Sequence, residues 1–242
     1  MYSIKKMILS TVVILSTIGC IFYFNHKQTG PKFAEGTKML IFDFDGTIAD
    51  SLPALFQALN NNASYYGYKK IDNLNSLIGK DSAELLQAFE ISFIKLPLVV
   101  NAIRKEISTQ MTSIKPFDNL LSIFSQLHSQ GIKLGIVTTN STENVKQFLA
   151  HHNLDYFDLI HGGNSLFGKG KILHQLLKDH NLKASDIIYI GDETRDIDAA
   201  KENSIRCAAV TWGLCTAEKL TIKKPDFMIS EKSELLALAQ LI

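Results

Sequence analysis

Two groups of acidic residues stand at positions where they could do chemistry together. Asp43 and Asp45 lie in the sequence DFDGT, and Asp192 and Asp196 lie in GDETRD. Each group follows a short run of apolar residues typical of a buried strand. Carboxylates held close together are costly unless a cation joins them, and Mg²⁺ favours a few carboxylates plus waters and a substrate phosphate. The two groups therefore predict a Mg²⁺ site, provided that the fold brings them together.

The elements that must position these acids alternate along the chain. Strand-like runs occupy 39–44, 133–138, 186–190 and 206–210, with a weaker one at 159–161, and helix-like apolar spacing occurs within 120–127, 145–149 and 172–177. Such alternation specifies an α/β fold with a parallel sheet and helices on both faces. Ligands of such sheets bind at the carboxyl ends of the strands, which is where both acidic groups fall.

The alternation is interrupted between residues 51 and 114. Leucine and phenylalanine there recur only at helical spacing, as in Leu52, Leu55 and Leu59 and again in Leu85 and Phe89. We expect an all-helical insertion after the first strand, placed as a cap over the mouth of that strand's loop. A cap in that position would select the substrate and exclude water.

The N-terminus carries a different signal. Lys5 and Lys6 precede 18 uncharged, mostly apolar residues at 7–24, which as a helix would extend about 27 Å, close to the thickness of a membrane's hydrocarbon core. We predict that 1–27 is an uncleaved N-terminal apolar helix that associates the protein with a membrane. A cleaved signal peptide, a lipoprotein processed at Cys20 and a translation start near Met39, which would leave the protein cytoplasmic, are the alternatives.

Composition narrows the functional classes. The 242 residues carry 25 basic and 24 acidic side chains, so no net field favours nucleic acid. Three cysteines without CxxC spacing argue against a structural zinc site. A disulfide between Cys207 and Cys215 is left open by the sequence.

Four motifs in order carry a family resemblance. They are Asp43, Asp45 and Thr47 in DxDGT; Thr138 after a strand-like run; a lysine before a helix, with Lys169 favoured over Lys171; and Gly191-Asp192 with Asp196. In this order and spacing the chain resembles the haloacid dehalogenase-like hydrolase superfamily, in the branch with a helical cap. The resemblance implies a Rossmann-like core formed by 39–50 and 115–242, a cap formed by 51–114, and a linker at 28–38.

The resemblance also implies roles in catalysis. Asp43 would attack phosphorus and form an aspartyl-phosphate, while Asp45 would protonate the leaving oxygen and later activate water. Mg²⁺ would be bound by Asp43, by Asp45 through its carbonyl, and by Asp192. The substrate's phosphoryl oxygens would be held by Thr138, Thr139 and Lys169.

Four further positions have expected supporting roles. Glu193 and Asp196 would orient metal-bound waters or Lys169. Gly79 and Lys80 resemble the loop that selects substrates in capped relatives, and Lys80 would contact a second anionic group of the substrate.

The function implied is hydrolysis of a small phosphorylated metabolite by a Mg²⁺-dependent phosphatase resembling phosphoglycolate phosphatases, acting as a monomer or homodimer. Asp45 argues against a dehalogenase, whose halide leaving group needs no proton. The open alternatives are a phosphosugar mutase, a pyrophosphatase, a phosphonatase and a non-catalytic membrane-tethered binding protein.

Overall fold

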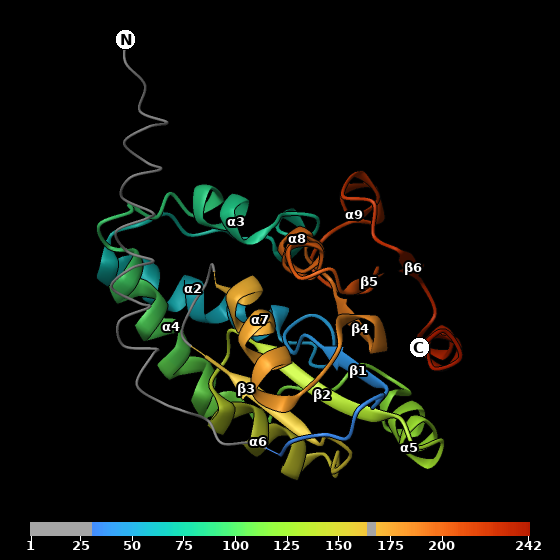
Figure 1. The fold of residues 1–242 in the computed structure, drawn as a ribbon. Coiled ribbons are helices and arrows are strands. Elements are labelled where there is room, and N and C mark those ends of the chain that lie inside the picture. Colours follow the sequence, from blue (N-terminus) through green and yellow to red (C-terminus); the bar gives the residue numbers. More distant parts are fainter. Residues whose placement is uncertain (1–30, 164–167) are drawn as a thin grey trace.

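The computed structural model describes residues 31–163 and 168–242, which form an α/β structure around a six-stranded parallel sheet (Figure 1). The strands are β1 (Met39–Phe42), β2 (Lys133–Thr138), β3 (Leu159–Gly162), β4 (Ile187–Gly191), β5 (Arg206–Val210) and β6 (Phe227–Ile229). Their order is β3-β2-β1-β4-β5-β6. Because β1 pairs with β2 on one side and β4 on the other, the connections reverse direction at β1, and this is where open α/β sheets bind ligands.

Helices cover both faces of this sheet. Apolar residues of α5 (Leu120–Ser129), α6 (Thr142–His151) and α10 (Leu235–Leu238) pack with Leu40 and Phe42 of β1. Those of α7 (Lys169–His180), α8 (Thr194–Glu202) and α9 (Ala217–Ile222) pack with Met39 and Ile41. Alternate residues of β1 thus face opposite layers, as the two-residue period of a strand requires. Short 3₁₀ turns occur at Leu74–Ser76, Ala184–Asp186 and Lys232–Glu234.

A helical segment interrupts the pattern between β1 and α5. It contains α2 (Leu52–Tyr66), α3 (Ser82–Ala88) and α4 (Leu96–Gln110), and we call residues 51–114 the helical insertion. These helices gather as a group beyond the sheet and its two helical layers (Figure 1). They share a separate apolar cluster that includes Leu59, Phe89 and Val99. The insertion therefore has a small core of its own.

The chain enters and leaves the insertion through two paired segments. The N–H of Asp50 donates to the carbonyl of Lys115 at 2.9 Å, and the N–H of Phe117 donates to the carbonyl of Ile48 at 3.0 Å. Residues 49 and 116 form an antiparallel bridge between these bonds. The two crossings between sheet and insertion consequently lie side by side.

Several expectations from the sequence change in detail. β1 ends at Phe42, so Asp43 and Phe44 belong to the loop that follows, and β6 is a short edge strand that the sequence pattern did not reveal. Cys207 and Cys215 do not form a disulfide; each is a free, buried thiol that fills apolar space on the α8 and α9 face of the sheet.

The expected apolar helix at 7–24 lies outside the described residues. Within residues 31–163 and 168–242, no helix combines the length and the apolar character that crossing a membrane requires.

Candidate active site

The loop after β1 fixes the first acidic group. The N–H of Asp43 donates to the carbonyl of Ile190 at 2.7 Å, which continues the pairing of β1 with β4 by one residue. The chain then turns at Gly46, whose φ of +80° suits glycine. A Cβ on Gly46 would overlap the Asp192 side chain, and so would one on Gly213. Two glycines therefore allow the backbone to close around the Asp192 carboxylate.

Three buried carboxylates converge at the ends of β1 and β4. Asp43, Asp192 and Asp196 each offer an oxygen within 4.8 Å of the others. The Nζ atom of Lys169, at the first position of α7, lies 2.9 Å from Asp43 and 2.5 Å from Asp196. Lys171 lies on the exposed side of α7. The structure thus brings Lys169 to the acids, as the sequence favoured.

The electrostatics of this cluster reflect burial and crowding of like charges. Burial raises the pKa of Asp43 to about 7, although the charge of Lys169 opposes this. Burial, together with the neighbouring carboxylates of Glu193 and Asp196, raises the pKa of Asp192 well above its usual range. Burial also disfavours the charge on Lys169, but the adjacent carboxylates outweigh it and raise the pKa of Lys169. The cluster holds more negative charge than its lysine compensates.

This donor set fits Mg²⁺. Its members are hard carboxylate oxygens, they lie close enough to share an ion, and a divalent cation would relieve the repulsion between them. The hydroxyl of Thr47 donates a hydrogen bond to Asp192 at 2.9 Å, and the N–H of Leu214 donates a second one at 2.8 Å. These bonds fix the orientation of the Asp192 carboxylate.

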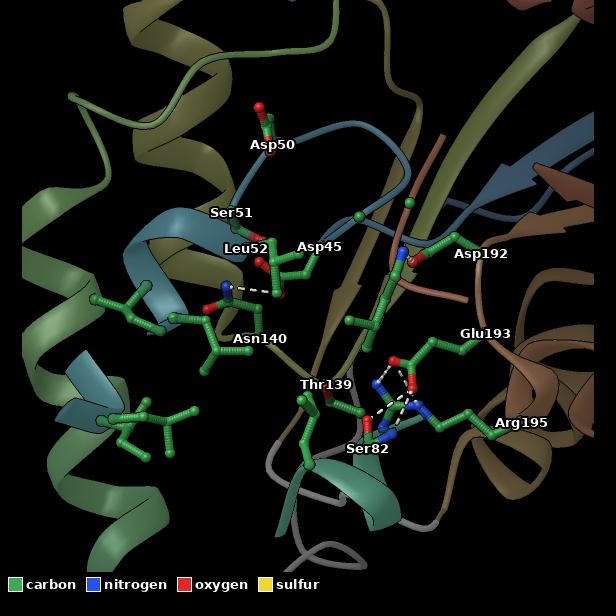
Figure 2. Close-up of a pocket in the computed structure, with 18 of the residues that line it drawn as sticks. Asp45, Asp50, Ser51, Leu52, Ser82, Thr139, Asn140, Asp192, Glu193 and Arg195 are labelled. Atoms are coloured by element: carbon green, nitrogen blue, oxygen red, sulfur yellow. Dashed lines mark hydrogen bonds and ion pairs between the residues drawn. The ribbon is translucent and has the colours of Figure 1, made fainter. Parts of the chain in front are cut away.

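Asp45 lies apart from the cluster and faces a pocket (Figure 2). Its carboxylate accepts a hydrogen bond from the Nδ2 of Asn140 at 3.1 Å, and burial raises its pKa while hydrogen bonds from Ser51 and Asn140 oppose the rise. Asn144 in turn donates to Asn140 at 2.9 Å. Asp45 is therefore held by hydrogen bonds at the pocket, with a pKa that burial shifts upward.

Asn140 was not predicted from the sequence. Asn140 lies two residues after Thr138, the last residue of β2. This spacing is the sequence signal from which its place in the site could have been predicted. The buried Thr138 hydroxyl accepts the N–H of Asn140 at 3.1 Å, and Thr139 lines the pocket. The three residues form one turn beside the end of β1.

The pocket lies between the sheet and the helical insertion and has a volume of about 250 Å³. Asp45, Asn140 and Asp192 are among the residues that line it from the sheet side. The insertion supplies a largely apolar wall: Leu52, Leu55, Leu59, Leu85, Leu86, Val100, Ile103 and Ile107. Among the described residues of the insertion, Arg104 is the charged side chain that lines this pocket. Gly79 and Lys80 do not line it.

Glu193 faces the insertion. Its carboxylate accepts the hydroxyl of Ser82 at 2.7 Å and the Nε of Arg195 at 3.0 Å, and Figure 2 shows these three side chains joined. Asp196 instead contacts Lys169 and accepts the N–H of Glu193 at 3.0 Å. Glu193 and Asp196 were both expected to orient metal-bound waters or Lys169. The structure separates them: Asp196 lies in the carboxylate cluster, whereas Glu193 connects the sheet domain to the insertion.

Gly79 forms part of the same junction. Its N–H donates to the carbonyl of Leu214 at 2.8 Å. Nearby, Lys219 of α9 forms an ion pair with Glu84 of α3. The loop that was expected to select the substrate thus joins the insertion to the sheet domain beside the pocket.

The buried lysine and the three buried carboxylates together form a site that can hold a divalent cation and an anionic group. A model of the haloacid dehalogenase-like hydrolase family matches residues 40–210. The chain belongs to this family.

Similar proteins agree with this membership. A phosphoglycolate phosphatase from Synechococcus elongatus is 30% identical over 207 residues, which cover 84% of this chain and 98% of that protein. One from Vibrio parahaemolyticus is 27% identical, with coverages of 82% and 94%. A haloacid dehalogenase-like hydrolase from Streptococcus pneumoniae has a solved structure that superposes with a TM-score of 0.71 at 25% identity, covering 85% of this chain and 99% of that one.

Proposed function

We propose that this hydrolase is a Mg²⁺-dependent phosphatase that cleaves a small phosphate monoester through an aspartyl-phosphate on Asp43. The observation that carries the proposal is the contact of Lys169 with both Asp43 and Asp196, beside Asp192, at the switch point of the sheet. A nearby cation favours the ionised form of Asp43, which is the form that attacks phosphorus.

The reaction divides between the two aspartates of DFDGT. An oxygen of Asp43 forms a bond to phosphorus as the bond from phosphorus to the leaving oxygen breaks. Asp45, whose pKa is raised by burial, gives a proton to that leaving oxygen. Asp45 then removes a proton from water, and the water oxygen attacks phosphorus and releases Asp43 and inorganic phosphate.

The remaining residues hold charged oxygens in place. Lys169 and the hydroxyl of Thr138, with backbone N–H groups near Thr139, bind the phosphoryl oxygens. Mg²⁺ bound by Asp43, the carbonyl of Asp45 and Asp192 would supply positive charge that stabilises the transition state. Asp196 orients Lys169 through their 2.5 Å contact.

The substrate we propose resembles phosphoglycolate, with the helical insertion acting as a cap. The curated relatives named above are phosphoglycolate phosphatases. The largely apolar wall of the pocket offers few partners for the hydroxyls of a sugar, and unpaired polar groups disfavour binding. Because Arg104 is the charged side chain among the described residues of this wall, the lining offers a partner for a small acid and few for a phosphosugar, and so favours a phosphatase over a sugar phosphate mutase.

The test is release of inorganic phosphate from phosphoglycolate by the full chain, with Mg²⁺ and with chelator. We expect Mg²⁺-dependent release that Asp43→Asn abolishes, by a factor of about 10³ or more, because the nucleophile is lost. Asp72→Asn is the matched control, since Asp72 is exposed on the insertion. Turnover by Asp43→Asn at the wild-type rate would overturn the mechanism.

We also propose that residues 1–27 associate the protein with a membrane, on the basis of the apolar run at 7–24. Expression of the full chain followed by fractionation tests this. Recovery with the membranes, lost when 1–27 are deleted, is expected, and recovery wholly in the soluble fraction would exclude the anchor.

A further inference from the structure

One face of α4 forms part of the pocket wall. Its residues Val100, Ile103, Arg104 and Ile107 all line the pocket, and their spacing places them on one side of a helix. Three are apolar and one is a cation. An arginine within an apolar stripe that faces a cavity differs from the usual solvent-facing arginine of an amphipathic helix.

Arg104 reaches toward the reacting end of the pocket. An Nη of its guanidinium donates to the carbonyl of Thr139 at 3.4 Å, so it lies next to the turn that follows Thr138. Burial lowers the pKa of Arg104, and the charge of Asp45 opposes this. The guanidinium thus lies beside the turn that carries Asn140, whose amide donates to Asp45, and both Arg104 and Asp45 line the pocket.

The chemistry of this position selects an anion. A guanidinium presents five N–H donors in a planar fork that matches a carboxylate with two parallel hydrogen bonds. Apolar neighbours strengthen such a pair because they exclude water, and they also accommodate carbon atoms. Lys80, which the sequence suggested for this role, does not line the pocket.

We propose that Arg104 is a specificity-determining residue that binds a carboxylate on the leaving group, so that the substrate is the phosphate ester of a short hydroxy acid. The carbon chain of the acid rests on the leucines and isoleucines of the insertion. This inference rests on the proposed phosphatase function and narrows its substrate class.

The test compares two phosphate esters of similar size in the wild type and in Arg104→Met. Phosphoglycolate carries a carboxylate on its leaving group, and ethyl phosphate does not. We expect Arg104→Met to lower kcat/KM for phosphoglycolate about 100-fold, the loss typical of one bidentate charged contact, and to change ethyl phosphate by less than about threefold. Lys105→Met is the control, since Lys105 is the next residue of α4 and is exposed. It should leave both values unchanged.

Arg104→Lys provides a second measurement that retains the charge and most of the side-chain length. It should recover part of the preference for phosphoglycolate, because a lysine binds a carboxylate without the fork geometry. Thermal unfolding of both variants shows whether the fold is retained. If Arg104→Met does not fold, the ratio of the two esters in Arg104→Lys decides.

The outcomes separate this inference from the proposed function. If the wild type is active and both Arg104 variants keep its preference for phosphoglycolate, the inference is overturned and the proposed function stands. An equal loss for both esters would also overturn it, since that pattern indicates a structural role. A wild type that releases phosphate from neither ester would overturn the proposed function, and the inference with it.

Discussion

The sheet end and the helical insertion build opposite walls of one pocket in different ways. At the sheet end the polar groups are buried and joined to one another: Asp43, Lys169 and Asp196 are each at most 4% exposed and lie in contact. The insertion wall is largely apolar and has Arg104 as its cation. Under the proposed function, the reacting groups lie where backbone geometry fixes side chains, and substrate selection would fall to helices outside the sheet.

Polar contacts join the two regions beside the pocket. Ser82 contacts Glu193, Glu84 pairs with Lys219, and Gly79 bonds Leu214. Changes in the sheet end should therefore reduce turnover for every substrate, whereas changes at the junction or on the insertion should alter mainly apparent affinity and preference.

The largest effect is expected for Asp192→Asn. The change replaces a carboxylate of the cluster with an amide, whose oxygen can still accept the N–H of Leu214 while its NH₂ group donates to the hydroxyl oxygen of Thr47. We expect kcat to fall about 10³-fold and the activation by Mg²⁺ to weaken, because a metal contributes several kcal/mol of charge stabilisation. Rate against Mg²⁺ concentration measures both effects.

The control for this variant is Asp226→Asn, whose carboxylate accepts the N–H of Cys207 away from the cluster. It should keep the wild-type dependence on Mg²⁺. An Asp192→Asn protein with unchanged kcat and unchanged Mg²⁺ dependence would contradict the assignment of the metal site.

A smaller effect is expected for Asn140→Ala. Without its bond from Asn140, Asp45 is positioned by fewer contacts, so proton donation to the leaving oxygen should slow. We expect about a 10- to 100-fold loss of kcat for an alkyl phosphate. The loss should be less than about threefold for p-nitrophenyl phosphate, whose leaving group needs little protonation.

Asn101→Ala, on the exposed side of α4, is the matched control. Equal losses for the two leaving groups would show that Asn140 supports the fold or phosphate binding instead of Asp45.

The smallest effect is expected at the junction. Glu193→Gln weakens the bond from Ser82 and the ion pair with Arg195, so the insertion should be held less firmly. We expect KM to rise about three- to tenfold and kcat to stay within about twofold. The coupling between Glu193 and Ser82 is measured by comparing the steady-state kinetics of Glu193→Gln, Ser82→Ala and the double variant.

Non-additive effects in that cycle would indicate a direct interaction. Glu84→Gln should change KM less, because an ion pair with more solvent exposure contributes less. A loss of kcat in Glu193→Gln as large as that in Asp192→Asn would remove the distinction between the two regions.

The sequence predicted the sheet end better than the insertion, for a physical reason. Asp43, Asp45 and Asp192 follow strands, and parallel strands bring their carboxyl ends to one edge regardless of the details of packing. Arg104 reaches the pocket because of how α4 packs against α2, and that packing depends on whole side chains. No local pattern marked it.

Other differences have local causes. β6 is three residues long and lies at an edge, too short for a clear alternating pattern. Glu193 was expected to orient metal-bound waters or Lys169 together with Asp196, but the residues at the start of α8 point in different directions, and Glu193 contacts Ser82. Adjacent positions in a motif do not share an environment.

The paired crossings at 49–50 and 115–117 have a consequence for how such a protein can diversify. Because the chain departs from the sheet and returns to it at neighbouring points, the sheet requires only that these two points be connected. A loop, a shorter bundle or an unrelated helical unit could satisfy that requirement. The sheet domain can therefore be inherited intact while evolution exchanges the helical insertion.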